Sequence, residues 1–299
     1  MSIDITEIFC VIDDFCKEFE PMLEQKKLNN KKSPKRRRRR KGFMSLSEIM
    51  TILMMFHLSK MKTFKDFYFK IIRVYFKSYF PKLLSYNRFL EWIPRTAFAF
   101  ATLFQLTCGK CTGISFIDSM PLKVCHNKRI SRHKVFKGLA GRGKSSMGWF
   151  FGLKLHAVIN PFGELIDIMI SSGNFSDNKG LKPLSKRISG LLFGDKGYIS
   201  KEKGEWLLEY KEVKLLTTIR KNMKPVQMTP TEKALLKKRF LIETVFGKLQ
   251  AETEMNHTRH RSPRNFLTNL LSALVCYNLY IKKPIIQKLE IEKDFLVAA

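Results

Sequence analysis

Three acidic residues, Asp118, Asp195 and Glu243, stand beside or within apolar runs, where carboxylates are uncommon. Asp118 ends the run ISFID, Asp195 ends LLFGD, and Glu243 lies inside FLIETVF. A lone acid at a strand end is usually a turn cap or a surface group, but neither aspartate has an evident local reason to be there. Carboxylate oxygens are the hard ligands that Mg²⁺ prefers. Two divalent ions about 4 Å apart would activate an attacking oxygen and stabilise the leaving oxygen in a phosphodiester displacement.

The elements that must position these acids begin after the run CTG, where the apolar period moves from 3.6 towards 2 and glycines become frequent. We predict a short strand at 114–118, ended by a proline soon afterwards, and a second strand at 149–159, where apolar residues alternate. The turn NPFG then leads to a third strand at 164–171. These three strands form a meander.

Strands and helices alternate in the rest of this region, which predicts parallel pairing through crossover helices. The carboxyl ends of neighbouring parallel strands meet at one edge of a sheet, so we expect Asp118 and Asp195 to lie close together there. Glu243 would approach from a helix packed across the sheet. Carboxylates that converge in this way repel one another, so without metal at least one is expected to have a raised pKa. The predicted elements are a helix at 178–188, a strand at 191–194, a helix at 201–210, a strand at 213–218, a long helix at 231–252 and a helix starting after Pro263.

The first part of the chain is predicted to be helical. Ser45 and Glu48 form a capping box in front of an apolar periodic run, and further helices are predicted at 63–79 and 85–106. Within the last of these, Asn87 and Arg88 could reach base edges as part of a helix-turn-helix, although any amphipathic helix carries such residues.

The charge balance is strongly basic, with 55 Lys and Arg residues against 26 Asp and Glu residues and a formal net charge of +29. Such a chain needs a polyanionic partner, and nucleic acid is the first candidate. A membrane surface is the second, but no apolar run approaches the roughly 20 residues of a spanning helix. Six cysteines are too sparse for a disulfide scaffold, which favours a reducing, cytoplasmic setting.

Several basic clusters are candidate phosphate contacts. In the tract KKSPKRRRRRK nine of eleven residues are basic, and we interpret it as a tether along DNA rather than a nuclear signal or a solvated tail. A flexible basic loop is predicted at 126–148, and another cluster follows the glutamate helix; a solvated loop and a helix-end charge complement are their simpler explanations. Arg239 precedes Glu243 by one helical turn, so it forms a surface salt bridge or orients the acid and meets phosphate. The candidate DNA contacts in these segments are Arg36, Arg37, Arg38, Lys128, Arg129, Arg132, Lys134, Arg142, Lys144, Arg239, Lys248, Arg259, His260 and Arg261.

Two further patterns point elsewhere and are not favoured. Gly138 to Ser145 satisfies the phosphate-loop pattern, but that mechanism requires a strand before the glycines and a helix after them, whereas a strand pattern follows here. Cys108 and Cys111 form a lone CxxC, with Cys125 and His126 as conceivable additional ligands. That spacing is incomplete for zinc, so buried free thiols are the favoured interpretation.

Taken together, the sequence motifs of this chain resemble those of the transposases of bacterial insertion sequences of the DDE superfamily, and most closely the insertion-sequence 982 family. The resemblance covers most of the chain. It is carried by SLSEIMTILMMFH, SYNRFLEW, FIDSMPLKVCHNKRISRHKVFKGLAGRGKSSMGWFFGLKLH, LFGDKGYIS, TIRKNMK, IETVFGKLQ and HTRHRSPRNF.

This resemblance implies an α/β, RNase H-like catalytic domain with a mixed sheet, preceded by an all-helical DNA-binding region. It also implies that Asp118, Asp195 and Glu243 are the catalytic, metal-binding triad, with Mg²⁺ or Mn²⁺ as cofactor in two sites. The partners would be double-stranded DNA, as element ends and target, and further copies of the chain on that DNA, within the nucleoid. We expect a helical segment at 1–30, a basic linker at 31–42, a helical DNA-binding domain at 43–112, the catalytic domain at 113–282 and a tail at 283–299.

The glutamate signature of related transposases is similar to Tyr-x2-Arg-x3-Glu-x6-Lys, and this chain departs from it twice. Arg239 and Glu243 match, but Leu236 stands at the tyrosine position and Gln250 at the lysine position, although Lys248 is near. A catalytically impaired copy that only binds DNA, or a nuclease of the same fold, therefore remain alternatives to an active transposase.

Overall fold

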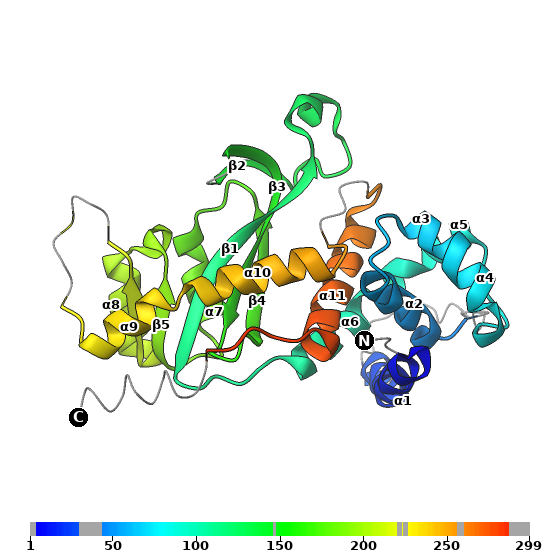
Figure 1. Ribbon diagram of the computed structural model, residues 1–299, viewed down its shortest axis with the longest axis horizontal. Coiled ribbons are helices and arrows are strands. Elements are labelled where there is room, and N and C mark those ends of the chain that lie inside the picture. The colour runs from blue at the N-terminus through cyan, green and yellow to red at the C-terminus, as the bar shows by residue number, and fades with distance from the viewer. Residues whose placement is uncertain are drawn as a thin grey trace. The chain divides into compact units, whose positions relative to one another are not determined.

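The computed structural model describes residues 4–29, 44–145, 148–219, 223, 227–255 and 260–286, and the side chains within these ranges except those of 26–29 (Figure 1). The chain forms two compact units. Unit 1 comprises 1–107 with 252–279, and unit 2 comprises 108–251 with 280–299. Of the candidate DNA contacts, Arg36, Arg37, Arg38 and Arg259 lie outside the described residues.

Unit 1 is built from helices, as the sequence predicts. The predicted capping box is present: the Ser45 side chain accepts from the backbone N–H of Glu48, whose carboxylate accepts from the backbone N–H of Ser45. The longer helices of the unit are α1 (Ile5–Asn29), α2 (Leu46–Leu58), α5 (Tyr86–Trp92), α6 (Ala97–Thr107) and α11 (Pro263–Tyr280).

The helices predicted at 63–79 and 85–106 are each interrupted. The first is divided into α3 (Phe64–Asp66), a π-helix η1 (Phe67–Ile72), α4 (Arg73–Tyr75) and a 3₁₀ turn η2 (Lys77–Tyr79). The π-helix buries Phe67, Tyr68 and Ile72. The second is divided by the 3₁₀ turn η3 (Ile93–Thr96), which contains a proline near its start. Proline has no backbone N–H to donate, which explains the interruption there.

Helix α11 is largely buried. It buries eleven of its side chains, and His57 Nε2 lies 2.9 Å from Ser272 Oγ while Asn265 Nδ2 donates to the carbonyl of Leu90. Residues 252–279, which we expected within the domain at 113–282, therefore group with unit 1. Contacts with the other helices of unit 1, such as those with His57 and Leu90, account for this grouping.

Unit 2 contains a six-stranded mixed sheet in the order β2-β3-β1-β5-β6, with β4 also paired to β3. The strands β1, β2, β3 and β4 pair antiparallel, and β1, β5 and β6 pair parallel. This confirms the predicted meander followed by parallel crossovers. The strands are β1 (Ile114–Cys125), β2 (Gly141–Ser145), β3 (Gly148–Ile159), β4 (Leu165–Ser172), β5 (Gly190–Gly194) and β6 (Val213–Thr217).

Strand β1 is longer than predicted and runs through Pro121 to Cys125. The parallel pairing with β5 ends at Ile117, so beyond that point β1 is paired only with β3. A proline is tolerated on such an edge because no neighbour requires its missing N–H there.

The predicted flexible loop at 126–148 is wrong in part, because it contains a 3₁₀ helix, η4 (Asn127–Arg132), and strand β2. Phe136 is buried and its ring stacks on His133 at 5.7 Å, which anchors the segment. We call residues 126–145, together with the paired ends of β1 and β3, the arm. Residues 141–145 of the phosphate-loop pattern form a strand followed by β3, so this pattern does not open a helix.

The helices of unit 2 are shorter than predicted in two places. The helix predicted at 178–188 is reduced to a 3₁₀ turn η5 (Asp177–Gly180) and α7 (Leu181–Leu184). The helix predicted at 231–252 is divided into α9 (Pro230–Lys237) and α10 (Phe240–Glu252), and Arg239 lies at the break. Helix α8 (Lys201–Lys211) agrees with the prediction, and η6 (Lys196–Tyr198) follows β5.

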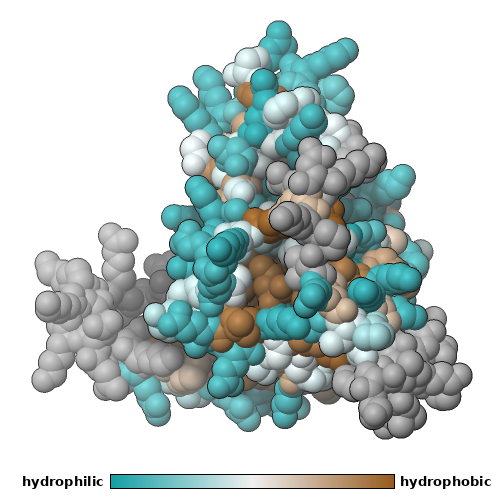
Figure 2. Space-filling view, turned by 90° about the vertical axis from the view of Figure 1, so that its left-hand side faces the viewer, coloured by the Kyte–Doolittle hydropathy of each residue, from teal (hydrophilic) through white to brown (hydrophobic). Residues whose placement is uncertain are grey.

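One cluster of the core of unit 2 joins Ile117, Val158, Leu192, Tyr198 and Leu207. Phe116 and Phe193, which project to the opposite face of the sheet, are buried as well. Hydrophilic residues cover most of the face shown in Figure 2, and hydrophobic residues reach the surface near its centre. Across the described part of the chain, none of the helices has the length and apolar character needed to span a bilayer.

Buried His57 makes a prediction about acid stability. Burial lowers the pKa of His57 from the usual 6.5 to about 3. Below pH 6.5 the unfolded chain binds a proton at this imidazole that the folded protein does not bind. The contribution of neutral His57 to the free energy of unfolding is therefore fully present above pH 6.5 and decreases as the pH falls. We expect this term to remove about 2 kcal/mol by pH 5.

The measurement is urea denaturation of the wild type and His57→Gln between pH 5 and 7. The variant should show a shallower loss of stability with falling pH, whereas His126→Gln, at an exposed position, should match the wild type. Equal slopes for the wild type and His57→Gln would contradict the prediction.

Candidate active site

The two aspartates lie side by side because of the register between β1 and β5. Ile117 pairs with Gly194, which is the last pair of this parallel ladder, and Asp118 and Asp195 are the next residues on their strands. The predicted proximity of the two acids is confirmed, but Asp118 lies within β1, where the parallel ladder ends, and not at the carboxyl end of the strand. Asp195 also begins η6, and its Oδ1 accepts from the Thr218 hydroxyl at 2.9 Å.

Arg239 joins the third acid to the first. Its Nη1 lies 2.9 Å from Asp118 Oδ2, and its Nη2 lies 2.9 Å from Glu243 Oε1. Arg239 lies between α9 and α10, and Glu243 lies in the first turn of α10. Helix α10 crosses the sheet (Figure 1). The side chains of Arg239 and Asp118 are 16% and 21% exposed, whereas that of Glu243 is 59% exposed. The expected Arg239–Glu243 pair is thus present, but it is shared with Asp118.

The pKa values of the two aspartates are shifted in opposite directions, although burial acts to raise both. It raises the pKa of Asp118 to about 6, against the hydrogen bond from the Ser119 N–H and the charge of Arg239, and the charge of Asp195 raises it further. Burial also acts to raise the pKa of Asp195, but hydrogen bonds from the Lys196 N–H and the Thr218 hydroxyl outweigh it, so this pKa is below its usual value. The expectation of a raised carboxyl pKa is confirmed, although burial contributes more than repulsion between the acids.

The donor set fits a divalent cation in part. Asp118 and Asp195 present hard carboxylate oxygens on adjacent strands, which suits Mg²⁺ or Mn²⁺. Among the described residues, however, no three His, Cys, Asp or Glu side chains are gathered as a metal site. The arrangement explains why: Arg239 is paired with both Asp118 and Glu243 and supplies the positive charge between them.

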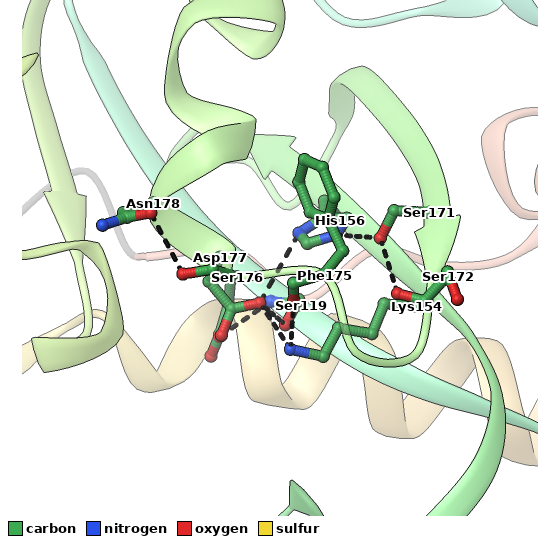
Figure 3. Close-up of polar contacts among 10 residues, drawn as sticks. Ser119, Lys154, His156, Ser171, Ser172, Phe175, Ser176, Asp177 and Asn178 are labelled. Atoms are coloured by element: carbon green, nitrogen blue, oxygen red, sulfur yellow. Dashed lines mark hydrogen bonds and ion pairs between the residues drawn. The ribbon is translucent and has the colours of Figure 1, made fainter. Parts of the chain in front are cut away.

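A second polar cluster lies beside Asp118 and is centred on Asp177 (Figure 3). Asp177 Oδ1 accepts from the Ser119 hydroxyl at 2.8 Å and from Lys154 Nζ at 3.0 Å. Lys154 Nζ also donates to the carbonyl of Phe175 at 3.0 Å, which ties β3 to the segment before η5. Because Lys154 and Asp177 are only 13% and 27% exposed, this ion pair is shielded from water.

His156 completes the Asp177 cluster. Its ring is fully buried, with Nδ1 3.8 Å from Asp177 and Nε2 2.8 Å from the Ser171 hydroxyl. Burial lowers the pKa of His156 to about 4, although the charge of Asp177 opposes this shift. The imidazole is therefore neutral near pH 7 and acts as a hydrogen-bonding group.

Sequence reasoning missed the Asp177 cluster, although the sequence held a signal for it. Lys154 and His156 are alternate residues of GLKLHAVI, so both project from one face of a strand that is otherwise mostly apolar. Two polar side chains on a buried face need partners. The partner Asp177 lies in a loop with no such periodicity, which is why it was not identified.

The other candidate DNA contacts lie in several places. The six on the arm are exposed, and Lys144 Nζ lies 5.9 Å above the ring of Trp149, itself 60% exposed. Lys248 donates to the carbonyl of Lys282 at 2.7 Å. In unit 1, Asn87 and Arg88 are exposed on α5, with Arg88 2.6 Å from Glu91, while His260 packs its ring against Phe266 and the neighbouring Arg261 is exposed.

The Lys154–Asp177 pair leads to a stability prediction. We expect Lys154→Met to lower the free energy of unfolding by about 1–3 kcal/mol, because the variant leaves a partly buried carboxylate without its cation. The double variant Lys154→Met/Asp177→Asn should recover part of that loss. Urea denaturation measures both, with exposed Lys179→Met as the control. A loss for Lys154→Met no larger than for the control would show that the pair contributes nothing.

Comparison with known proteins places this site in a family. Comparison with curated proteins gave no match. A family model described as transposase DDE domain matches residues 108–263, which is more than half of the chain and includes Asp118, Asp195, Arg239 and Glu243. The chain therefore belongs to the transposase DDE domain family.

Proposed function

We propose that this protein is the transposase of an insertion sequence, which cuts DNA at the element ends and joins them to a target. The observation that carries the proposal is the link Asp118–Arg239–Glu243 beside Asp195, inside the region that matches the family. The strand order agrees with the RNase H-like fold that the sequence resemblance implies. The sequence motifs that resemble the insertion-sequence 982 family support the narrower proposal that the protein belongs to this family.

The reaction has two displacements at phosphorus. Water adds to the phosphorus at an element end, the bond to the 3′ oxygen breaks, and this oxygen takes up a proton. The freed 3′ hydroxyl then adds to a phosphorus of the target, and the target's own 3′ oxygen leaves. Mg²⁺ or Mn²⁺, held by Asp118, Asp195 and Glu243 in two sites, would supply charge stabilisation to both oxygens.

Arg239 has a specific role in this proposal. A guanidinium binds phosphate as readily as carboxylate, with the same two-pronged geometry. When DNA arrives, Arg239 exchanges its bonds to Asp118 and Glu243 for bonds to phosphate, which frees both carboxylates. The same side chain thus stabilises the acids in the absence of DNA and orients the backbone in its presence.

DNA contacts are proposed for both units. The arm offers exposed cations together with the Lys144–Trp149 pair, which suits a duplex backbone because phosphate contacts position DNA without reading its sequence. The helical region at 43–112, with Asn87 and Arg88, would bind element ends, and the tract at 31–42 would serve as the tether. Assembly of several copies on DNA in the nucleoid completes the proposal.

The test is a nicking and strand-transfer assay with purified protein, labelled element ends and Mg²⁺ or Mn²⁺. Asp118→Asn, Asp195→Asn and Glu243→Gln should each reduce nicking by at least about a hundredfold, because each removes a charged ligand. Glu209→Gln, on the exposed side of α8, is the matched control and should cut like the wild type. Cleavage by Asp118→Asn at the control rate would overturn the site assignment.

The same assay separates the two alternatives. Tight, salt-sensitive binding without nicking by the wild type would identify a chain that only binds DNA, as the departures at Leu236 and Gln250 allow. Cleavage without joined products would identify a nuclease.

A further inference from the structure

Unit 1 contains a groove that the active site does not use. It encloses about 1080 Å³ and lies between α2, the segment from α3 to η2, α5 and the start of α11. All of its lining residues belong to unit 1. Its size is at the upper end of ordinary ligand pockets.

Aromatic side chains form one wall of this groove. The ring of Phe69 lies 5.5 Å from that of Tyr86, and Tyr86 stacks on Phe64 at 6.3 Å. Phe64 and Tyr86 are half-buried in a larger aromatic cluster, which fixes their orientation. Phe69 is 37% exposed, so this ring remains accessible to a ligand in the groove.

The backbone that presents Phe69 is unusual. Phe69 lies in the π-helix η1, and Arg73 is the residue that directly follows this helix. The Arg73 guanidinium lies 5.3 Å from the centroid of the Phe69 ring. π-Helical turns are rare and occur frequently at functional sites. In this groove the turn brings an aromatic ring and a cation to the same wall.

The rim of the groove is positively charged. Four exposed basic residues line it: Lys65, Arg73, Lys77 and Arg261. None of them forms an ion pair within the part of the chain that the structure describes. The one lining acid, Asp66, is already bound by Lys70 at 2.9 Å and by the Thr63 hydroxyl. The groove therefore attracts anions along its rim while its wall offers flat apolar rings.

We propose that this groove binds an unpaired nucleotide of single-stranded DNA, with the base against Phe69 and the phosphates against Arg73, Lys77 and Arg261. Aromatic rings beside cations bind single strands because every base has a stacking face and every nucleotide carries a phosphate. The bases of an intact duplex are already stacked and cannot enter. The inference rests on the proposed function, because the cut DNA ends that it produces are where a nucleotide can leave its pair.

The experiment uses the full-length protein and a short oligothymidylate that contains one 2-aminopurine, whose fluorescence is quenched by stacking. We expect quenching on binding, and at least about tenfold weaker affinity with loss of quenching in Phe69→Leu. Arg73→Gln should weaken binding and flatten its salt dependence without abolishing the quenching at saturation. Tyr75→Leu is the matched control, since Tyr75 is 69% exposed on the same segment but does not line the groove.

Equal affinities of Phe69→Leu and Tyr75→Leu, or no quenching with the wild type, would overturn the proposal. Circular dichroism verifies that each variant is folded. If Phe69→Leu does not fold, Arg73→Gln still tests the proposal. Nicking of fully duplex element ends distinguishes the two proposals. If the protein nicks duplex DNA but Phe69→Leu binds the oligothymidylate as the wild type does, only the groove proposal is rejected. If the groove binds the oligothymidylate but the protein does not nick, only the proposed catalysis is rejected.

Discussion

The double ion pair of Arg239 is the interaction on which the arrangement of the site depends. An arginine side chain that is only 16% exposed requires partners for its charge, and two carboxylates from different elements provide them. Arg239 lies in the turn between α9 and α10, and from there it joins its helical partner Glu243 to Asp118 of the sheet.

The sheet is held at the same point from its other side. Asp118 and Ser119 are consecutive in β1, so their side chains project to opposite faces. Asp118 meets Arg239, and Ser119 donates to Asp177, which is fixed by Lys154. Polar contacts therefore fix both faces of β1 where its parallel ladder with β5 ends. A strand fixed in this way keeps the carboxylate of Asp118 in one position, as catalysis by positioned charge requires.

Local patterns were sufficient to predict much of the fold. The alternation in β3, the NPFG turn, the capping box at Ser45 and the crossovers around β5 each follow from a few neighbouring residues, and each is present. The parallel crossovers also predicted that Asp118 and Asp195 would meet. What was missed depends on distant residues: Arg239 and Asp118 are 121 positions apart, and their pairing leaves no local trace. The π-helix and the extension of β1 through Pro121 are likewise set by tertiary packing.

The proposed function requires that Asp118, Asp195 and Glu243 hold divalent cations together. The direct measurement is the melting temperature of the full-length protein bound to duplex DNA, where Arg239 has released the acids, with EDTA and with millimolar Mn²⁺, for the wild type, Asp118→Asn and Glu209→Gln. A cation that binds only the folded state stabilises it, by about 2.7 kcal/mol at a hundred times its dissociation constant. We predict that Mn²⁺ raises the melting temperature of the wild type and of Glu209→Gln equally, and that Asp118→Asn loses most of this increment. An unchanged wild-type melting temperature, or a full increment in Asp118→Asn, would contradict the account.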